Sequence, residues 1–345
     1  MAMRNAPMAE GLLLGWRSRL QRLGSWLPAG AARWVSLLSF GFLLAALLSH
    51  GSQVLALAPD PQGWLWLLLG VGVSLASLVG SAVLWGIVLR WLGCQPRWQP
   101  LVLRYLSSNA RKYLPGGVWH LAARLQMLRD QGPAGTATLL QNPSPLPLSL
   151  ALVAVLLDPL VAAVAALALV ASGGLQGGLA LVVLLPLLVL LPRWLAPLLS
   201  WLERRKAAAL GLDGGDGQPQ GIAAPPLPAT YPWQALLAGA LFVLLRFAGF
   251  ACCVLALDLQ PVLGWGGWLS GFALAWTAGL VVPGAPAGLG VFEVVLLLRL
   301  GSALPEPPLL ALAICYRLVV SLADALAALT AAADASGHGL ARLRN

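Results

Sequence analysis

The sequence predicts an all-α, polytopic transmembrane helical bundle, and three observations support this fold class. Hydrophobic residues make up 59% of the 345-residue chain, charged residues only 10%, and the mean hydropathy is +0.83. A soluble globular domain carries about 25% charged residues, which cover its surface. Six apolar stretches approach or exceed the roughly 20 residues that cross the hydrocarbon core as a helix. These stretches are continuously apolar rather than alternating, which favours helices over strands.

The six predicted spans cover residues 33–57, 64–90, 146–171, 174–192, 233–257 and 308–333. Before them, residues 1–30 place basic residues beside an apolar helical face, so we expect a basic interfacial helix; a disordered basic tail is the alternative. The Gly- and Pro-rich stretch 207–232 predicts a flexible cytoplasmic linker between two membrane halves, 31–206 and 233–335. Residues 336–345 then form a cytoplasmic tail.

The basic residues predict the orientation of the chain. Most of the 21 lysines and arginines fall in the N-terminal segment, in 90–130, in 193–206 and in the C-terminal tail. Basic residues collect on the cytoplasmic side of spanning helices. We therefore expect a multi-pass protein of the inner (plasma) membrane with both termini in the cytoplasm. The same distribution explains the net charge of +9 without nucleic-acid binding.

Two regions, 100–130 and 265–300, do not fit a simple count of spans. Each is an apolar stretch, a Pro/Gly break and a second apolar stretch, and the orientation requires both ends of each region on one side. We interpret them as two re-entrant helix pairs, an arrangement typical of inverted-repeat transporters. Amphipathic loops resting on each face are the alternative. The predicted turn residues are Pro115, Gly116, Gly117, Pro283, Gly284, Pro286, Gly288 and Gly290.

Several ionisable residues lie in or beside apolar helices, where charges are costly and usually functional. Arg317 and Asp324 are seven positions apart on nearly the same helix face, so we expect each to pair with another helix. Arginine can bind a phosphate through two parallel hydrogen bonds, which predicts an anionic head group. The alternative is a network that only holds the bundle together. The candidates for a substrate site or pathway are Arg111, Lys112, Asp158, Arg246, Glu293, Arg317 and Asp324.

Motifs for catalysis or metal binding are missing from the sequence. It has no nucleotide-binding glycine loop, no His-Glu-x-x-His and no Gly-x-Ser-x-Gly. The cysteines Cys94, Cys252, Cys253 and Cys315 lack zinc-like spacing. We therefore expect a non-enzyme with no cofactor, metal or disulfide framework.

The two broken regions also carry a resemblance to a known family. The run Tyr113-Leu-Pro-Gly-Gly-Val-Trp119 followed by Arg124 resembles one signature of the lysylphosphatidylglycerol synthase transmembrane family. The run Pro283-Gly-Ala-Pro-Ala-Gly-Leu-Gly-Val-Phe-Glu293, with Tyr316-Arg317 after it, is similar to the second signature. The resemblance covers about residues 30–335. The positions carried over are Pro115, Gly116, Gly117, Arg124, Gly288, Gly290, Glu293 and Arg317.

This resemblance implies a lipid translocase of the stand-alone kind, without the family's soluble synthase domain, so lysyl transfer is not expected. The leading hypothesis is a flippase-like transporter of an anionic phospholipid or lipid-linked intermediate, with membrane lipids as its partners. The alternative is a non-catalytic membrane scaffold or regulator of a glycosyltransferase or lipid-modifying enzyme. An intramembrane transferase is a third hypothesis, for which the sequence offers no catalytic group.

Overall fold

The computed structural model describes residues 60–113, 119–129, 139–141, 146–171, 185–197, 227–281, 286–288 and 290–343. The predicted interfacial segment 1–30 and span 33–57 lie outside these residues. So do parts of the span 174–192 and of the linker 207–232, and the turn residues Pro115, Gly116, Gly117, Pro283 and Gly284.

The described residues form helices and one isolated bridge between Pro96 and Leu140. The α-helices whose two ends are described are α3 (Pro61–Trp91), α4 (Trp98–Asn109), α5 (Trp119–Arg129), α6 (Leu148–Val170), α9 (Trp233–Ala256), α10 (Trp265–Val281), α11 (Val291–Leu300) and α12 (Glu306–Leu343). Three 3₁₀ turns accompany them: η1 (Ala110–Tyr113), η4 (Gln260–Val262) and η5 (Pro286–Gly288). The predicted all-helical class is thus confirmed for the described residues.

Four of these helices are long and apolar enough to cross a membrane: Pro61–Trp91, Leu148–Val170, Trp233–Ala256 and Glu306–Ala331. They coincide with four of the six predicted spans. The final helix continues to Leu343, so its backbone extends well beyond the predicted end of that span at residue 333.

Local sequence explains where α3 begins and ends. The Asp60 carboxylate accepts a hydrogen bond from the Gly63 amide at 2.6 Å, and Pro61 occupies the first helical position, where no amide donor is needed. After Trp91 the chain leaves the helix through Gly93, whose φ of +84° suits glycine. At 1.5 Å per residue, the 31 residues between these caps extend about 46 Å.

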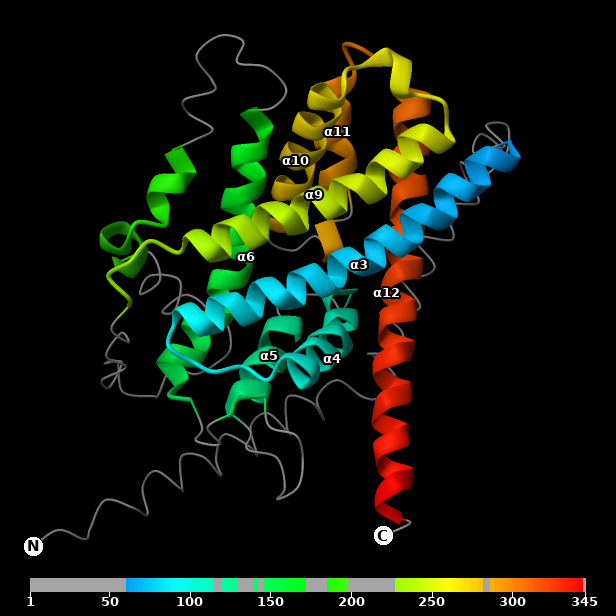
Figure 1. Ribbon diagram of the computed structural model, residues 1–345. Helices are drawn as coiled ribbons and strands as arrows, with labels where there is room; N and C mark the ends of the chain where they lie inside the picture. Colours follow the sequence, from blue (N-terminus) through cyan, green and yellow to red (C-terminus); the bar gives the residue numbers. More distant parts are fainter. Residues whose placement is uncertain are drawn as a thin grey trace, which may run out of the picture.

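Helices α3 and α9 lie side by side and run antiparallel, with α12 crossing them (Figure 1). Small residues allow the close approach. A Cβ atom on Gly249 of α9 would stand 2.5 Å from the Ser74 hydroxyl oxygen, and one on Gly70 of α3 would stand 3.1 Å from the Cys252 Cβ. Close contacts of this kind between small residues are the usual way in which helices associate in a membrane.

Both regions predicted to be interrupted have the form helix, break, helix. In the first, α4 and η1 precede α5; in the second, η5 separates α10 from α11. Figure 1 shows α4 and α5 on one side of the α3–α9 pair, and α10 and α11 on the other. The two breaks are nevertheless in contact, because η1 touches η5 and also touches α12.

Candidate functional site

Arg124 and Asp158 form a buried ion pair between the first broken region and α6. The guanidinium Nη1 of Arg124, on α5, lies 2.7 Å from the Asp158 carboxylate on α6. The two side chains are only 4% and 6% exposed. Charges at this depth are costly unless paired and hydrogen-bonded, so this contact joins α5 firmly to α6.

Neighbouring polar groups complete the environment of this pair. The Tyr105 hydroxyl donates a hydrogen bond to the same Asp158 oxygen at 3.0 Å. The Tyr105 oxygen in turn accepts a hydrogen bond from the Ser81 hydroxyl. Arg124 Nε donates to the Ser108 hydroxyl at 3.3 Å. The guanidinium also lies 3.6 Å from the centre of the Tyr105 ring, a cation–π contact. We call these five residues the Arg124 cluster; it joins helices α3, α4, α5 and α6.

Arg317 of α12 binds the second break. Its Nε donates to the Glu293 carboxylate at 2.8 Å, Nη1 to the Ala287 carbonyl at 2.6 Å and Nη2 to the Gly288 carbonyl at 2.8 Å. All three nitrogens of the guanidinium therefore bind protein acceptors on η5 and α11. Arg317 shapes the break directly, rather than presenting a free fork to a phosphate.

The backbone of the second break needs this support. Glu293 binds the Gly290 amide at 2.8 Å through its second oxygen, which caps the start of α11. Ala287 has a φ of +51°, a conformation that costs energy for a residue with a Cβ. Gly288, at φ +70°, packs so closely on Gly279 of α10 that a Cβ would stand 2.9 Å from its Cα. Glycine is therefore required at position 288.

Asp324, two turns after Arg317 on α12, binds the first broken region. One carboxylate oxygen lies 2.7 Å from Lys112 Nζ, and the other accepts from Asn109 Nδ2 at 2.9 Å. The Asp324 side chain is 4% exposed and that of Lys112 is 16% exposed. The prediction that Arg317 and Asp324 each pair with another helix is confirmed, since Glu293 lies on α11 and Asn109 on α4.

Arg246 lies buried in the middle of α9, beside a cluster of aromatic rings. Its guanidinium lies 5.9 Å from the centre of the Phe242 ring and is within electrostatic range of the Tyr316 hydroxyl. The charges of Arg246 and Arg317 both act electrostatically on Lys112. Lys112 of η1, the first of the two breaks, thus lies in the field of one cation from α9 and one from α12.

Of the seven candidates named from interior charge, six are brought into these contacts, as is Arg124, which the family resemblance adds; the seventh, Arg111, is exposed on η1. The partners that sequence reasoning missed include Tyr105 and Asn109, whose hydroxyl and side-chain amide donate hydrogen bonds to Asp158 and Asp324. Both are polar groups on the same short helix, α4. That signal is weak, because a tyrosine or an asparagine near a helix end is common in any protein.

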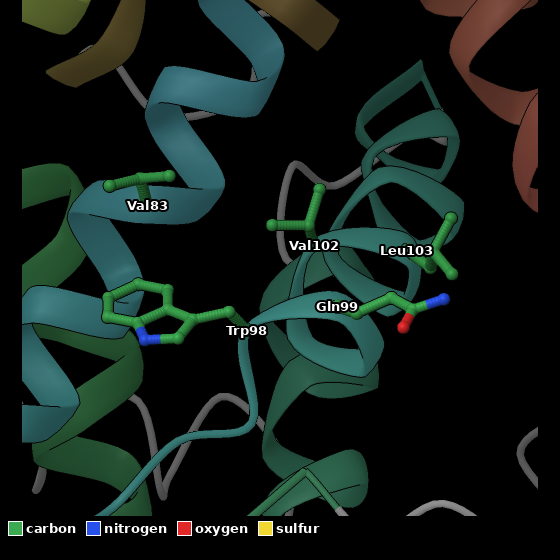
Figure 2. Close-up of a pocket in the computed structure, with 5 residues that line it drawn as sticks. All are labelled: Val83, Trp98, Gln99, Val102 and Leu103. Atoms are coloured by element: carbon green, nitrogen blue, oxygen red, sulfur yellow. The ribbon is translucent and has the colours of Figure 1, made fainter.

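An open groove of about 660 Å³ lies between α3 and α4. Val83 of α3 and the α4 residues Trp98, Gln99, Val102 and Leu103 line it (Figure 2). Trp98 packs against α3 at Gly86, where an added Cβ would stand 2.5 Å from its ring. The groove is almost wholly apolar, and none of the predicted site residues lines it.

The fold and the paired interior charges fit one class of protein: a helical membrane protein with four candidate spanning helices and two interrupted helical regions that meet. No protein-family model and no curated protein sequence matches the chain.

Proposed function

We propose that this protein is an integral membrane, flippase-like transporter that moves an anionic phospholipid or a lipid-linked intermediate between leaflets. The observation that carries the proposal is the contact between η1 and η5, which joins the two interrupted helical regions beside interior cations. The two regions are far apart in sequence, so only the fold places their breaks together.

Interrupted helices have a specific meaning in a membrane. Backbone groups freed by a break find no partner in lipid, so they are tolerated only where they are buried in protein or line a polar cavity. In transporters with discontinuous helices, the breaks lie near the bilayer midplane and bind the substrate. The meeting point of η1 and η5 is therefore the proposed head-group path.

The charges around that point favour an anionic substrate. Lys112 and Arg246 lie near the contact, and Arg111 is exposed on the same turn as Lys112. In the proposed mechanism, these three cations bind the phosphate, while Asp324 and Glu293 hold the breaks in place. Arg124 and Asp158 keep α5 against α6 and do not contact the head group.

The sequence resemblance supports the same function, since the lysylphosphatidylglycerol synthase transmembrane family is held to move a modified phosphatidylglycerol between leaflets. We propose that the chain is a member of this family that resides in the plasma membrane with both termini in the cytoplasm. The lipid that it moves shares the family substrate's phosphate chemistry, and the residues above bind that phosphate.

The test is reconstitution of the full chain into liposomes containing a fluorescent phosphatidylglycerol, with leaflet accessibility measured by a membrane-impermeant quencher. We expect faster exchange than in protein-free vesicles and a large loss in Arg246→Gln. The matched control is Arg90→Gln, which removes one positive charge at an exposed position at the end of α3 and should leave the rate unchanged.

Equal exchange with and without protein would reject transport, and the scaffold hypothesis would then take its place. Copurification of a glycosyltransferase or lipid-modifying enzyme from native membranes would support that alternative. Equal exchange rates in Arg246→Gln and Arg90→Gln would instead remove Arg246 from the proposed site.

A further inference from the structure

Helix α12 carries two charged side chains that bind the two broken regions separately. Arg317 holds η5 and the start of α11 through Glu293 and two backbone carbonyls. Asp324 holds the end of α4 and η1 through Asn109 and Lys112. Because seven residues are close to two full helical turns, both side chains leave α12 on nearly the same face.

A third contact joins the two breaks directly to each other. The breaks η1 and η5 touch each other, so each of the three elements, η1, η5 and α12, contacts the other two. A displacement of α12 must therefore carry both breaks with it or rupture one of the two polar contacts. A change in the distance between the two breaks would therefore strain one or both of these polar contacts with α12.

We propose that α12 is a tether that sets the separation of the two breaks, with Arg317 and Asp324 as its positioning residues. Their role in transport rests on the proposed function, because it assumes that the breaks line the head-group path. The tether itself is a property of the fold, and it can be measured without any lipid movement.

The two ends of the tether differ in chemistry. At the Asp324 end, the carboxylate binds the Lys112 ammonium and the Asn109 amide. This pair of opposite charges stays balanced when the lysine and the aspartate are swapped. At the Arg317 end, a planar fork reaches a carboxylate and two carbonyls at once, which lysine cannot reproduce. Swapping the two charges should therefore preserve the contact at the Asp324 end, whereas no conservative substitution of Arg317 should preserve the contact at the other end.

The experiment measures the distance between spin labels on the two broken regions of the full chain in liposomes. Labels are attached at Ala110→Cys on η1 and Leu298→Cys on α11, both exposed positions, in a chain whose four native cysteines are replaced by alanine or serine. We expect one narrow distance distribution in the parent chain. Arg317→Lys and Asp324→Asn should each broaden it into more than one population.

The exchanged pair Lys112→Asp with Asp324→Lys should restore the narrow distribution, as should Asp324→Glu with a small displacement. Glu306→Gln is the matched control, since it removes an exposed carboxylate from the first turn of the same helix and should change nothing. Circular dichroism and gel filtration identify variants that have lost the fold. If Arg317→Lys or Asp324→Asn loses the fold, the Lys112→Asp/Asp324→Lys pair and Asp324→Glu test the tether in its place.

An unchanged distribution in folded Asp324→Asn and Arg317→Lys would overturn the tether, as would an exchanged pair that folds but stays broad. Lipid exchange in the same vesicles separates this proposal from the proposed function. Distances that respond as expected in a protein that moves no lipid would leave the tether standing and reject transport. Lipid exchange in a protein whose variants keep the parent label distances would support transport and reject the tether.

Discussion

Each broken region forms one arginine–carboxylate pair with a neighbouring helix, and the two pairs differ in burial and in what else the arginine binds. Arg124 and Asp158 are 4% and 6% exposed and are surrounded by side chains, including the Tyr105 ring. Arg317 and Glu293 are 17% and 19% exposed, and Arg317 also binds the carbonyls of the break itself. The first pair joins regular helices, whereas the second holds an irregular turn.

This difference separates two functions of an interior charge. A deeply buried pair between helices fixes their packing, and it is intolerant of change because removal of one partner leaves the other charge desolvated. A half-buried arginine on a strained turn stabilises a conformation that the local sequence does not favour, as at Ala287. We therefore expect the two pairs to respond differently to substitution.

The largest effect is expected for Asp158→Asn, which leaves the Arg124 guanidinium buried without its carboxylate. Unfolding in detergent should show a loss of about 3–5 kcal/mol. The double substitution Arg124→Met with Asp158→Leu removes both charges and should cost much less. A double variant as unstable as Asp158→Asn would show that the cost comes from packing and not from the isolated charge.

A smaller loss, about 2–4 kcal/mol, is expected for Gly288→Ala. A Cβ at this position meets a φ of +70° and the Gly279 backbone at 2.9 Å, so it adds overpacking to backbone strain. Gly290→Ala is the matched comparison, because Gly290 has a φ of +82° but open space around its Cα. Equal losses from the two substitutions, measured as unfolding midpoints, would mean that the contact with α10 contributes nothing.

Arg317→Lys should cost about 1–3 kcal/mol, because one ammonium cannot serve Glu293 and both carbonyls. Lipid exchange should fall as well, since the break loses its shape. Arg299→Lys, an exposed arginine of α11, is the control for the chemical change alone. If Arg317→Lys is as stable as the wild type, the positive charge of Arg317 matters and its hydrogen bonds to the two carbonyls do not.

The smallest effect has the opposite sign. Ala287→Gly removes a side chain from a residue at φ +51° and should stabilise the fold by about 0.5–1 kcal/mol, after the extra chain entropy of glycine is subtracted. If thermal unfolding shows a net loss instead, the Ala287 conformation carries no strain that Arg317 must offset.

Local sequence was sufficient for the helical class, for four helices that are long and apolar enough to cross a membrane, and for the two interruptions. Hydropathy reports the solvent of each stretch, and proline and glycine act on their own backbone, so these features need no knowledge of distant residues. The positions of the interior charges followed in the same way. Arg317 and Asp324 could be placed on one helix face because helical periodicity is also local.

Only the tertiary structure decided which charges meet. Asn109 and Asp324 are 215 positions apart, and Arg124 and Asp158 are 34 apart, so their pairing depends on how α4, α5, α6 and α12 pack. The same packing brings η1 against η5 and directs Arg317 to backbone carbonyls rather than to a phosphate. Helix packing depends on many small contacts across the whole bundle, so it cannot be read from any single residue or local pattern.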